Sequence, residues 1–205
     1  MLVKSVRNAE SPRADEAPRT VEEWIQMLGA DDATTRRAAA RELGSRPEAV
    51  PALCTRLGIE GAPSVRGVIL TSLIRQKSQQ AVEGLIPLLS SEDTALRNAV
   101  IEALQDMPDA VAPHMDKLLL DPDSDVRIFA VNILSLLPHP DAPRWLTRVI
   151  SEDHHVNVCA AAVDCLAEVG DEAAIGPLIA LQDRFANVPF MSFAIEAALR
   201  RIRGC

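Results

Sequence analysis

Apolar positions recur along this sequence on two scales, the period of an α-helix and a longer period of about 31 residues. Counted from six leucines, apolar or small residues recur at offsets −8, −5, −4, −1, 0 and +3, which share one side of a helix that turns about 100° per residue. These anchor leucines are Leu43, Leu73, Leu104, Leu134, Leu166 and Leu199, at intervals of 30, 31, 30, 32 and 33 residues. The pattern predicts six amphipathic helices, over residues 32–47, 62–76, 93–108, 123–138, 155–170 and 189–204.

A shorter apolar segment precedes each of these helices. The segments cover residues 21–28, 51–58, 82–90, 113–121, 143–151 and 176–184, and turn residues separate them from the second helices. Thr20 and Glu23 form a capping box at the first of them. Pro51, Pro113, Pro143 and Pro177 are expected near helix starts, where a missing N–H costs little. Pro87 comes later in its segment and predicts a kink or a late start.

Each unit is thus predicted to be a helical hairpin, and no segment alternates in the way of a strand. A hairpin of this size cannot bury its own apolar face, whereas stacked hairpins build one continuous core. The sequence therefore predicts an all-α fold, an α-α superhelix (right-handed solenoid) of about six hairpins. It would be a single domain over residues 20–205, preceded by a flexible tail over residues 1–19, where charged residues alternate with prolines.

Arginine recurs at offset −7, on the edge of the apolar stripe in the first four units. An arginine there can lay its stem on the core and reach an acid or a carbonyl of the next unit. We interpret these residues as structural links between repeats, with the aspartates of the turns as acceptors. The arginines are Arg36, Arg66, Arg97 and Arg127, and the acceptors Asp93, Asp123 and Asp125; Cys159 and Ser192 replace arginine in the last two units.

The segment D-S-D-V-R-I-F-A-V-N-I-L at residues 123–134, repeated with this period after a proline-led first helix, resembles HEAT repeats. It is most similar to the short bacterial HEAT-like repeats of the phycobilin lyase kind. The resemblance covers residues 20–205 and implies a helical solenoid. It further implies a scaffold or adaptor that holds a partner along its concave surface, with bacterial signalling or complex assembly as the setting.

In such a solenoid the second helices line the concave face, and offsets −3 and −6 are expected to lie away from the core. Apolar residues occupy these offsets in the middle and last units: Leu70, Ile101, Ile128, Val131, Val163 and Phe193. A contiguous exposed apolar patch is typical of a binding surface. We therefore expect a groove that accepts a helix or loop of a partner protein. The alternative is that offset −3 packs against the adjacent repeat.

Charge and composition narrow the class of partner. The chain has 21 basic and 29 acidic residues, a net charge of −8, and only 3% aromatic residues. Residues 83–125 hold ten acids and two bases. This balance argues against a nucleic-acid binder, which needs a basic face. The acidic middle repeats predict either helix caps on a solvated face or a docking site for a basic patch of a partner.

The sequence contains few of the motifs that are typical of catalytic or metal sites. The four histidines form no metal-binding pair on a helix, and no glycine-rich phosphate loop or nucleophile elbow occurs. We expect no catalytic residues, no metal and no cofactor, and the four cysteines lack disulfide or CxxC spacing. No apolar run reaches the length of a membrane span or forms a signal peptide, so we expect a cytoplasmic location and no membrane partner.

The leading interpretation is a non-enzymatic module for protein–protein interaction. The alternative is an enzyme subunit of the bilin lyase or isomerase type, since that family uses similar repeats and paired subunits. A DNA glycosylase built on HEAT-like repeats is a third class, which the acidic middle of the chain opposes. Neither the identity of the partner nor the oligomeric state follows from the sequence.

Overall fold

The computed structural model describes residues 19–204, and this part of the chain contains twelve α-helices and no strand. The all-α prediction is confirmed. Of the predicted N-terminal tail, residues 1–18 lie outside the described residues. No described helix is long and apolar enough to cross a membrane.

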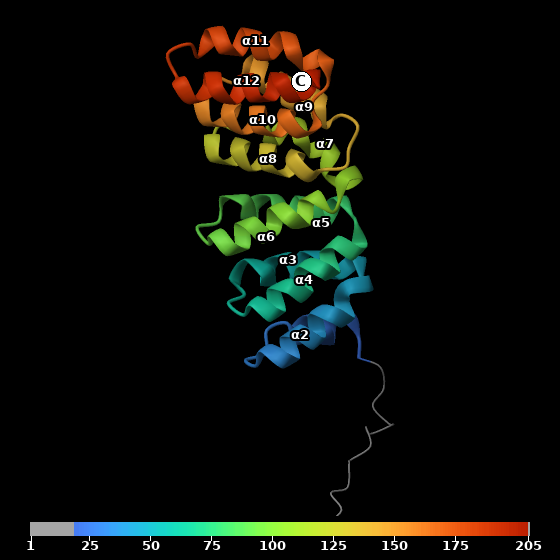
Figure 1. Ribbon diagram of the computed structural model, residues 1–205. Helices are drawn as coiled ribbons and strands as arrows, with labels where there is room; N and C mark the ends of the chain where they lie inside the picture. Colours follow the sequence, from blue (N-terminus) through green and yellow to red (C-terminus); the bar gives the residue numbers. More distant parts are fainter. Residues whose placement is uncertain (1–18, 205) are drawn as a thin grey trace, which may run out of the picture.

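The helices form six hairpins that stack in file from α2 to α12 (Figure 1). The first helices of the hairpins are α1 (Val21–Met27), α3 (Val50–Ile59), α5 (Gln79–Leu85), α7 (Pro108–Leu118), α9 (Ala142–Glu152) and α11 (Ile175–Arg184). The second helices are α2 (Ala33–Glu42), α4 (Pro63–Gln76), α6 (Thr94–Gln105), α8 (Ser124–Leu136), α10 (Val156–Val169) and α12 (Pro189–Arg203). The six predicted repeats therefore all form, and each contributes to the stack.

The helix starts follow from short polar side chains in the turns. Thr20 and Glu23 form the predicted capping box, in which each side chain accepts a backbone N–H of the other residue. Asp32, Asp93 and Asp123 accept backbone N–H groups at the starts of α2, α6 and α8 at 2.8, 3.0 and 2.9 Å. These caps fix where α2, α6 and α8 begin, and so where the outward side chains of these helices lie.

Two of the prolines lie near helix starts, as the sequence predicts. Pro51 and Pro143 are the second residues of α3 and α9. At Pro87, where a kink or a late start is expected, the helix is interrupted: α5 ends at Leu85 and a short 3-10 helix, η3 (Ile86–Ser90), follows it. The expected helix start at Pro113 is wrong. Helix α7 begins at Pro108, which takes the first position itself and leaves Pro113 inside the helix.

The core runs without interruption through the stack. All six anchor leucines are buried, and five of them have no exposed surface. Because the apolar faces of neighbouring hairpins cover one another, the accessible surfaces are the turns and the outward sides of the helices. Candidate functional residues lie on these two surfaces.

Candidate functional site

The predicted concave groove is only partly exposed. Leu70 and Ile101 are 8% exposed, and Val131 and Val163 are fully buried, so the expected exposure is wrong for these four residues. The physical reason is that neighbouring second helices pack closely together, which leaves little room for solvent between them. The Sγ of Cys165 on α10, for example, lies 3.8 Å from the backbone carbonyl oxygen of Val131 on α8. In the last hairpin the same offset carries Glu196, which is exposed.

An apolar strip remains over the last three second helices. Phe193 is 71% exposed, as predicted, and Ile128 is partly buried. Phe190, which the sequence argument missed, is 52% exposed and lies one turn before Phe193 on α12. Ala160 occupies offset −6 on α10, which lies between α8 and α12 (Figure 1). We call Ile128, Ala160, Phe190 and Phe193 the concave strip.

On the turn side of the stack, arginines link successive hairpins. Arg36 binds Glu60 of the next turn through two hydrogen bonds, Nε to Oε2 at 2.8 Å and Nη2 to Oε1 at 2.9 Å. Arg127 binds Asp153 in the same way, with its Nε 2.7 Å from Oδ2. Each of these arginines also donates to carbonyl oxygens of its own turn. Such bidentate pairs fix the distance between neighbouring turns.

The other two predicted arginines lie in the same row. Arg66 pairs with Asp93 at 2.6 Å and also donates to the carbonyl of Glu60. Arg97 donates to the carbonyl of Ser91 and lies over the ring of Phe129 at 4.9 Å, and its buried Nε has no partner among the described residues.

The expectation that Asp123 and Asp125 accept from these arginines is wrong for the described part of the chain. Asp123 caps α8 instead, and it does so by accepting the backbone N–H of Asp125. A short side chain at an N-cap already points at its own helix, so it does not extend toward the neighbouring turn.

The fifth hairpin has no arginine at offset −7, and an arginine from another position links its turn to the next hairpin. Cys159 stands at offset −7, and its Sγ lies 3.2 Å from the carbonyl oxygen of Asp153. Arg184, from the end of α11, donates to the carbonyls of Ile150 and Ser151 at 2.7 and 2.9 Å. The guanidinium therefore comes from the following repeat. Sequence periodicity missed Arg184 because it lies on a first helix, outside the recurrent offset.

Glu60 is the most enclosed acid of the row, and its side chain has no exposed surface. The hydrogen bond from Arg36, with further bonds from the Ala62 N–H and Arg56, lowers the pKa of Glu60 to about 2 despite burial. At Asp153, burial alone would raise the pKa, but the bonds from Arg127 and the His155 N–H outweigh it, so the pKa is lowered. Both carboxylates therefore stay ionised near neutral pH.

Between the turns of the fourth and fifth hairpins lies a cavity of about 610 Å³, which we call the turn hollow. It is lined by Leu119, Leu120, Asp121, Pro122, Arg127, Arg148, Val149, Glu152, Asp153, His154 and His155. Its volume lies within the range of small-molecule sites. Because Arg127 joins Asp153 across it, the two turns that form its walls are held at a fixed separation.

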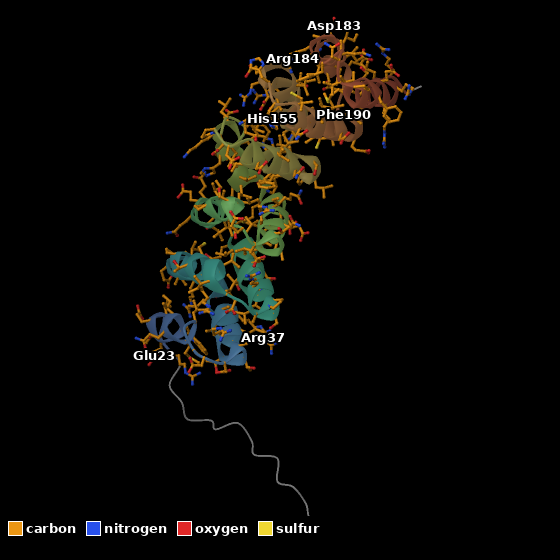
Figure 2. The ribbon with its side chains drawn as sticks, turned by 90° about the vertical axis from the view of Figure 1, so that its left-hand side faces the viewer. Glu23, Arg37, His155, Asp183, Arg184 and Phe190 are labelled. Atoms are coloured by element: carbon orange, nitrogen blue, oxygen red, sulfur yellow. The ribbon has the colours of Figure 1, made fainter. Side chains whose placement is uncertain are left out.

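The polar groups of the turn hollow are of two kinds. Arg127 and Asp153 satisfy each other, whereas Arg148 makes a single ion pair with Asp116, with Nη2 2.7 Å from Oδ1. The Nδ1 atom of His155 is buried and has no partner among the described residues. Figure 2 labels His155, which lies in the turn of the fifth hairpin. The turn hollow therefore has hydrogen-bonding capacity that the protein itself leaves unused.

Metal ligation has no support in the described residues, which contain no group of three or more potential His, Cys, Asp or Glu ligands. The free thiols of Cys54, Cys159 and Cys165 are buried. Burial raises the pKa of Cys54 and Cys165 to about 11, and burial likewise raises the pKa of Cys159, partly offset by Arg184.

These three thiols are expected to resist alkylation as long as the chain is folded. At a given pH, a pKa of about 11 instead of 9.0 leaves about a hundredfold less thiolate at Cys54 and Cys165, and burial blocks access as well. Mass spectrometry of peptides after iodoacetamide treatment measures this protection. Labelling in urea provides the control, and rapid labelling of any of the three in buffer would contradict the buried positions.

The fold and its repeats agree with comparisons to known proteins. The family profile described as HEAT repeats matches residues 50–127 and 113–188, which together cover more than half of the chain. A solved archaeal HEAT-like repeats protein from Thermococcus onnurineus NA1 superposes with a TM-score of 0.50 at 15% identity, over 90% of this chain and 87% of that one. The chain belongs to the HEAT-repeat family.

Two curated relatives are similar in sequence. The bilin biosynthesis protein PecE of Mastigocladus laminosus is 31% identical over 150 residues, which are 71% of this chain and 55% of the relative. A HEAT repeat-containing taxis protein of Halobacterium salinarum is 28% identical over 166 residues, 78% of this chain and 37% of the relative. The chain thus spans about half the length of the PecE relative and less of the taxis protein.

The prediction that the chain is not an enzyme is contradicted by this comparison. Similarity to a named bilin biosynthesis protein points to an enzyme subunit. The sequence contains no recognisable cluster of catalytic side chains. Such a cluster is not required of a subunit whose share of the chemistry is to bind and orient, and binding surfaces carry no fixed motif.

Proposed function

We propose that this chain is a HEAT-repeat subunit of an enzyme that handles a bilin, of the lyase or isomerase type. The observation that carries the proposal is the 31% identity to a bilin biosynthesis protein over 71% of the chain. The taxis relative shares the repeats at lower identity. The bilin would be the substrate of this enzyme.

The turn hollow supports this function. A bilin is an open-chain tetrapyrrole with apolar rings, pyrrole N–H donors and two carboxylate side chains. A cavity of about 610 Å³ with leucine and valine walls and both acids and arginines on its rim offers matching chemistry. A rigid stack of hairpins would hold such a flexible substrate in one conformation, which is how a binding subunit contributes to catalysis.

We also propose that this chain binds a protein partner. The concave strip is the surface we assign to it, with a helix or loop of the partner over Ile128 and Phe193. Exposed acids, Asp125, Asp164 and Glu196, lie on the same three second helices as the strip. They would favour a partner segment with basic residues beside its apolar face.

Titration with biliverdin tests the function directly. The folded chain is expected to change the visible absorption of biliverdin in a saturable, one-to-one manner with a Kd at or below about 10 µM. The same chain unfolded in urea serves as the control and should produce no saturable change. Absence of any spectral change with the folded chain would contradict the proposed function.

A further inference from the structure

The two arginines of the turn hollow have different surroundings. Arg127 uses its Nε, Nη1 and Nη2 atoms on Asp153 and on the carbonyls of Asp121 and Pro122. It is therefore committed to joining the two turns. Arg148, on α9, has the one ion pair with Asp116 on α7. Only Arg148 can be released to a ligand without dismantling the walls of the hollow.

The ion pair of Arg148 is exposed and easily exchanged. Its side chain is 31% exposed and that of Asp116 is 65% exposed. Pairs of this kind contribute little to stability, because water and salt screen both charges. A carboxylate that enters the turn hollow would replace Asp116 as the partner of Arg148, in a more enclosed setting where the charge-assisted bond is stronger.

The rest of the hollow indicates what that carboxylate is attached to. Leu120, which lines the hollow, is 67% exposed, and the buried residues Leu119 and Val149 line it as well. The orphaned Nδ1 atom of His155 can donate or accept one hydrogen bond. The rim also carries the carboxylates of Asp121 and Glu152, which accept from N–H donors. Apolar surface, a cation and hydrogen-bond acceptors therefore lie within one cavity.

We infer that the turn hollow binds an apolar molecule that carries a carboxylate, and that Arg148 is the residue that pairs with this carboxylate. The identification of the molecule as a bilin rests on the proposed function. In that case a carboxylate of the bilin binds Arg148, and Asp121 or Glu152 accepts from its pyrrole N–H groups. Asp116 competes with the ligand for the same guanidinium.

The competition between Asp116 and the ligand gives a matched pair of variants. Arg148→Gln removes the cation, whereas Asp116→Asn breaks the same ion pair but leaves the cation free. In a biliverdin titration, Arg148→Gln is expected to bind about tenfold more weakly, the loss typical of one hydrogen bond to a charged group. Asp116→Asn is expected to bind as tightly as the unaltered chain or more tightly. Arg144→Gln removes an exposed arginine of α9 that lies outside the hollow, and should leave the Kd unchanged.

The outcomes separate this inference from the proposed function. If the unaltered chain binds biliverdin and Arg148→Gln binds equally well, the inference is overturned while the proposed function stands. Equal weakening in Arg148→Gln and Asp116→Asn would show that the ion pair matters only for the structure, and this also overturns the inference. If the unaltered chain binds no biliverdin, both fail. Circular dichroism of each variant verifies that it is folded.

Discussion

Replacement of Glu60 by glutamine is expected to lower the free energy of unfolding by about 3–5 kcal/mol. The carboxylate of Glu60 accepts hydrogen bonds from Arg36, from Arg56 and from the backbone N–H of Ala62, and its side chain has no exposed surface. Glutamine has nearly the same shape but no charge, so it leaves the guanidinium of Arg36 without its counter-ion in a mostly buried position. Removal of one partner from such a pair is costly, because the remaining charge is not resolvated.

Urea unfolding followed by circular dichroism measures this effect, and its pH dependence identifies the cause. The pKa of Glu60 is about 2 in the folded chain and 4.5 as the ordinary value, so its stabilisation is complete above pH 4.5. It is lost as the pH falls from 4.5 toward 2. Glu60→Gln should lack this component of the acid profile. Glu168→Gln breaks an exposed pair with Arg201 and should leave the midpoint nearly unchanged. Equal midpoints for Glu60→Gln and the unaltered chain would refute the role of Glu60.

Aspartate at Val131 is expected to prevent folding, whereas aspartate at Ile128, three residues earlier on α8, is expected to be tolerated. Val131 has no exposed surface, so an aspartate there buries a carboxyl group without a hydrogen-bond partner, at a cost of about 4 kcal/mol or more. Ile128 is only partly buried, at the edge of the core. Its aspartate can remain hydrated.

Thermal unfolding and gel filtration of the two variants distinguish these outcomes. Ile128→Asp should elute and melt much like the unaltered chain, and Val131→Asp should be insoluble or show no cooperative transition. A stable, folded Val131→Asp protein would mean that offset −3 is accessible after all. Loss of folding in Ile128→Asp would instead place the concave strip inside the core. A folded Ile128→Asp variant is also the probe for partner binding along the strip.

The fold could be predicted because each hairpin repeats the same burial pattern. The spacing of the anchor leucines is enough to place six second helices, and Pro87 marks the point where its helix is interrupted. The errors arise where an element has two neighbours. The angular count on a single helix assigns offset −3 to solvent, but Val131 and Val163 have no exposed surface in the stack. A periodicity describes one helix, whereas burial in a stack depends on both sides of it.

The candidate sites were harder to predict for a different reason. The turn hollow joins residues from two turns about 32 positions apart, and its contacts include backbone carbonyls, which have no signature in the sequence. Arg184 shows the same limit, because it binds the carbonyls of Ile150 and Ser151 from another repeat. The bilin alternative was present in the family resemblance, but no set of side chains favoured it over a scaffold.

One link in the row of arginines is missing. Arg97 lies over the ring of Phe129, whereas Arg36 and Arg127 form ion pairs with carboxylates of the next turn. In the described chain, no ion pair joins the third and fourth hairpins. On the opposite edge, Gln105 still donates to the carbonyl of Asn132 at 2.8 Å. The third and fourth hairpins are therefore joined by the continuous apolar core and by the hydrogen bond of Gln105, without a charged link between their turns.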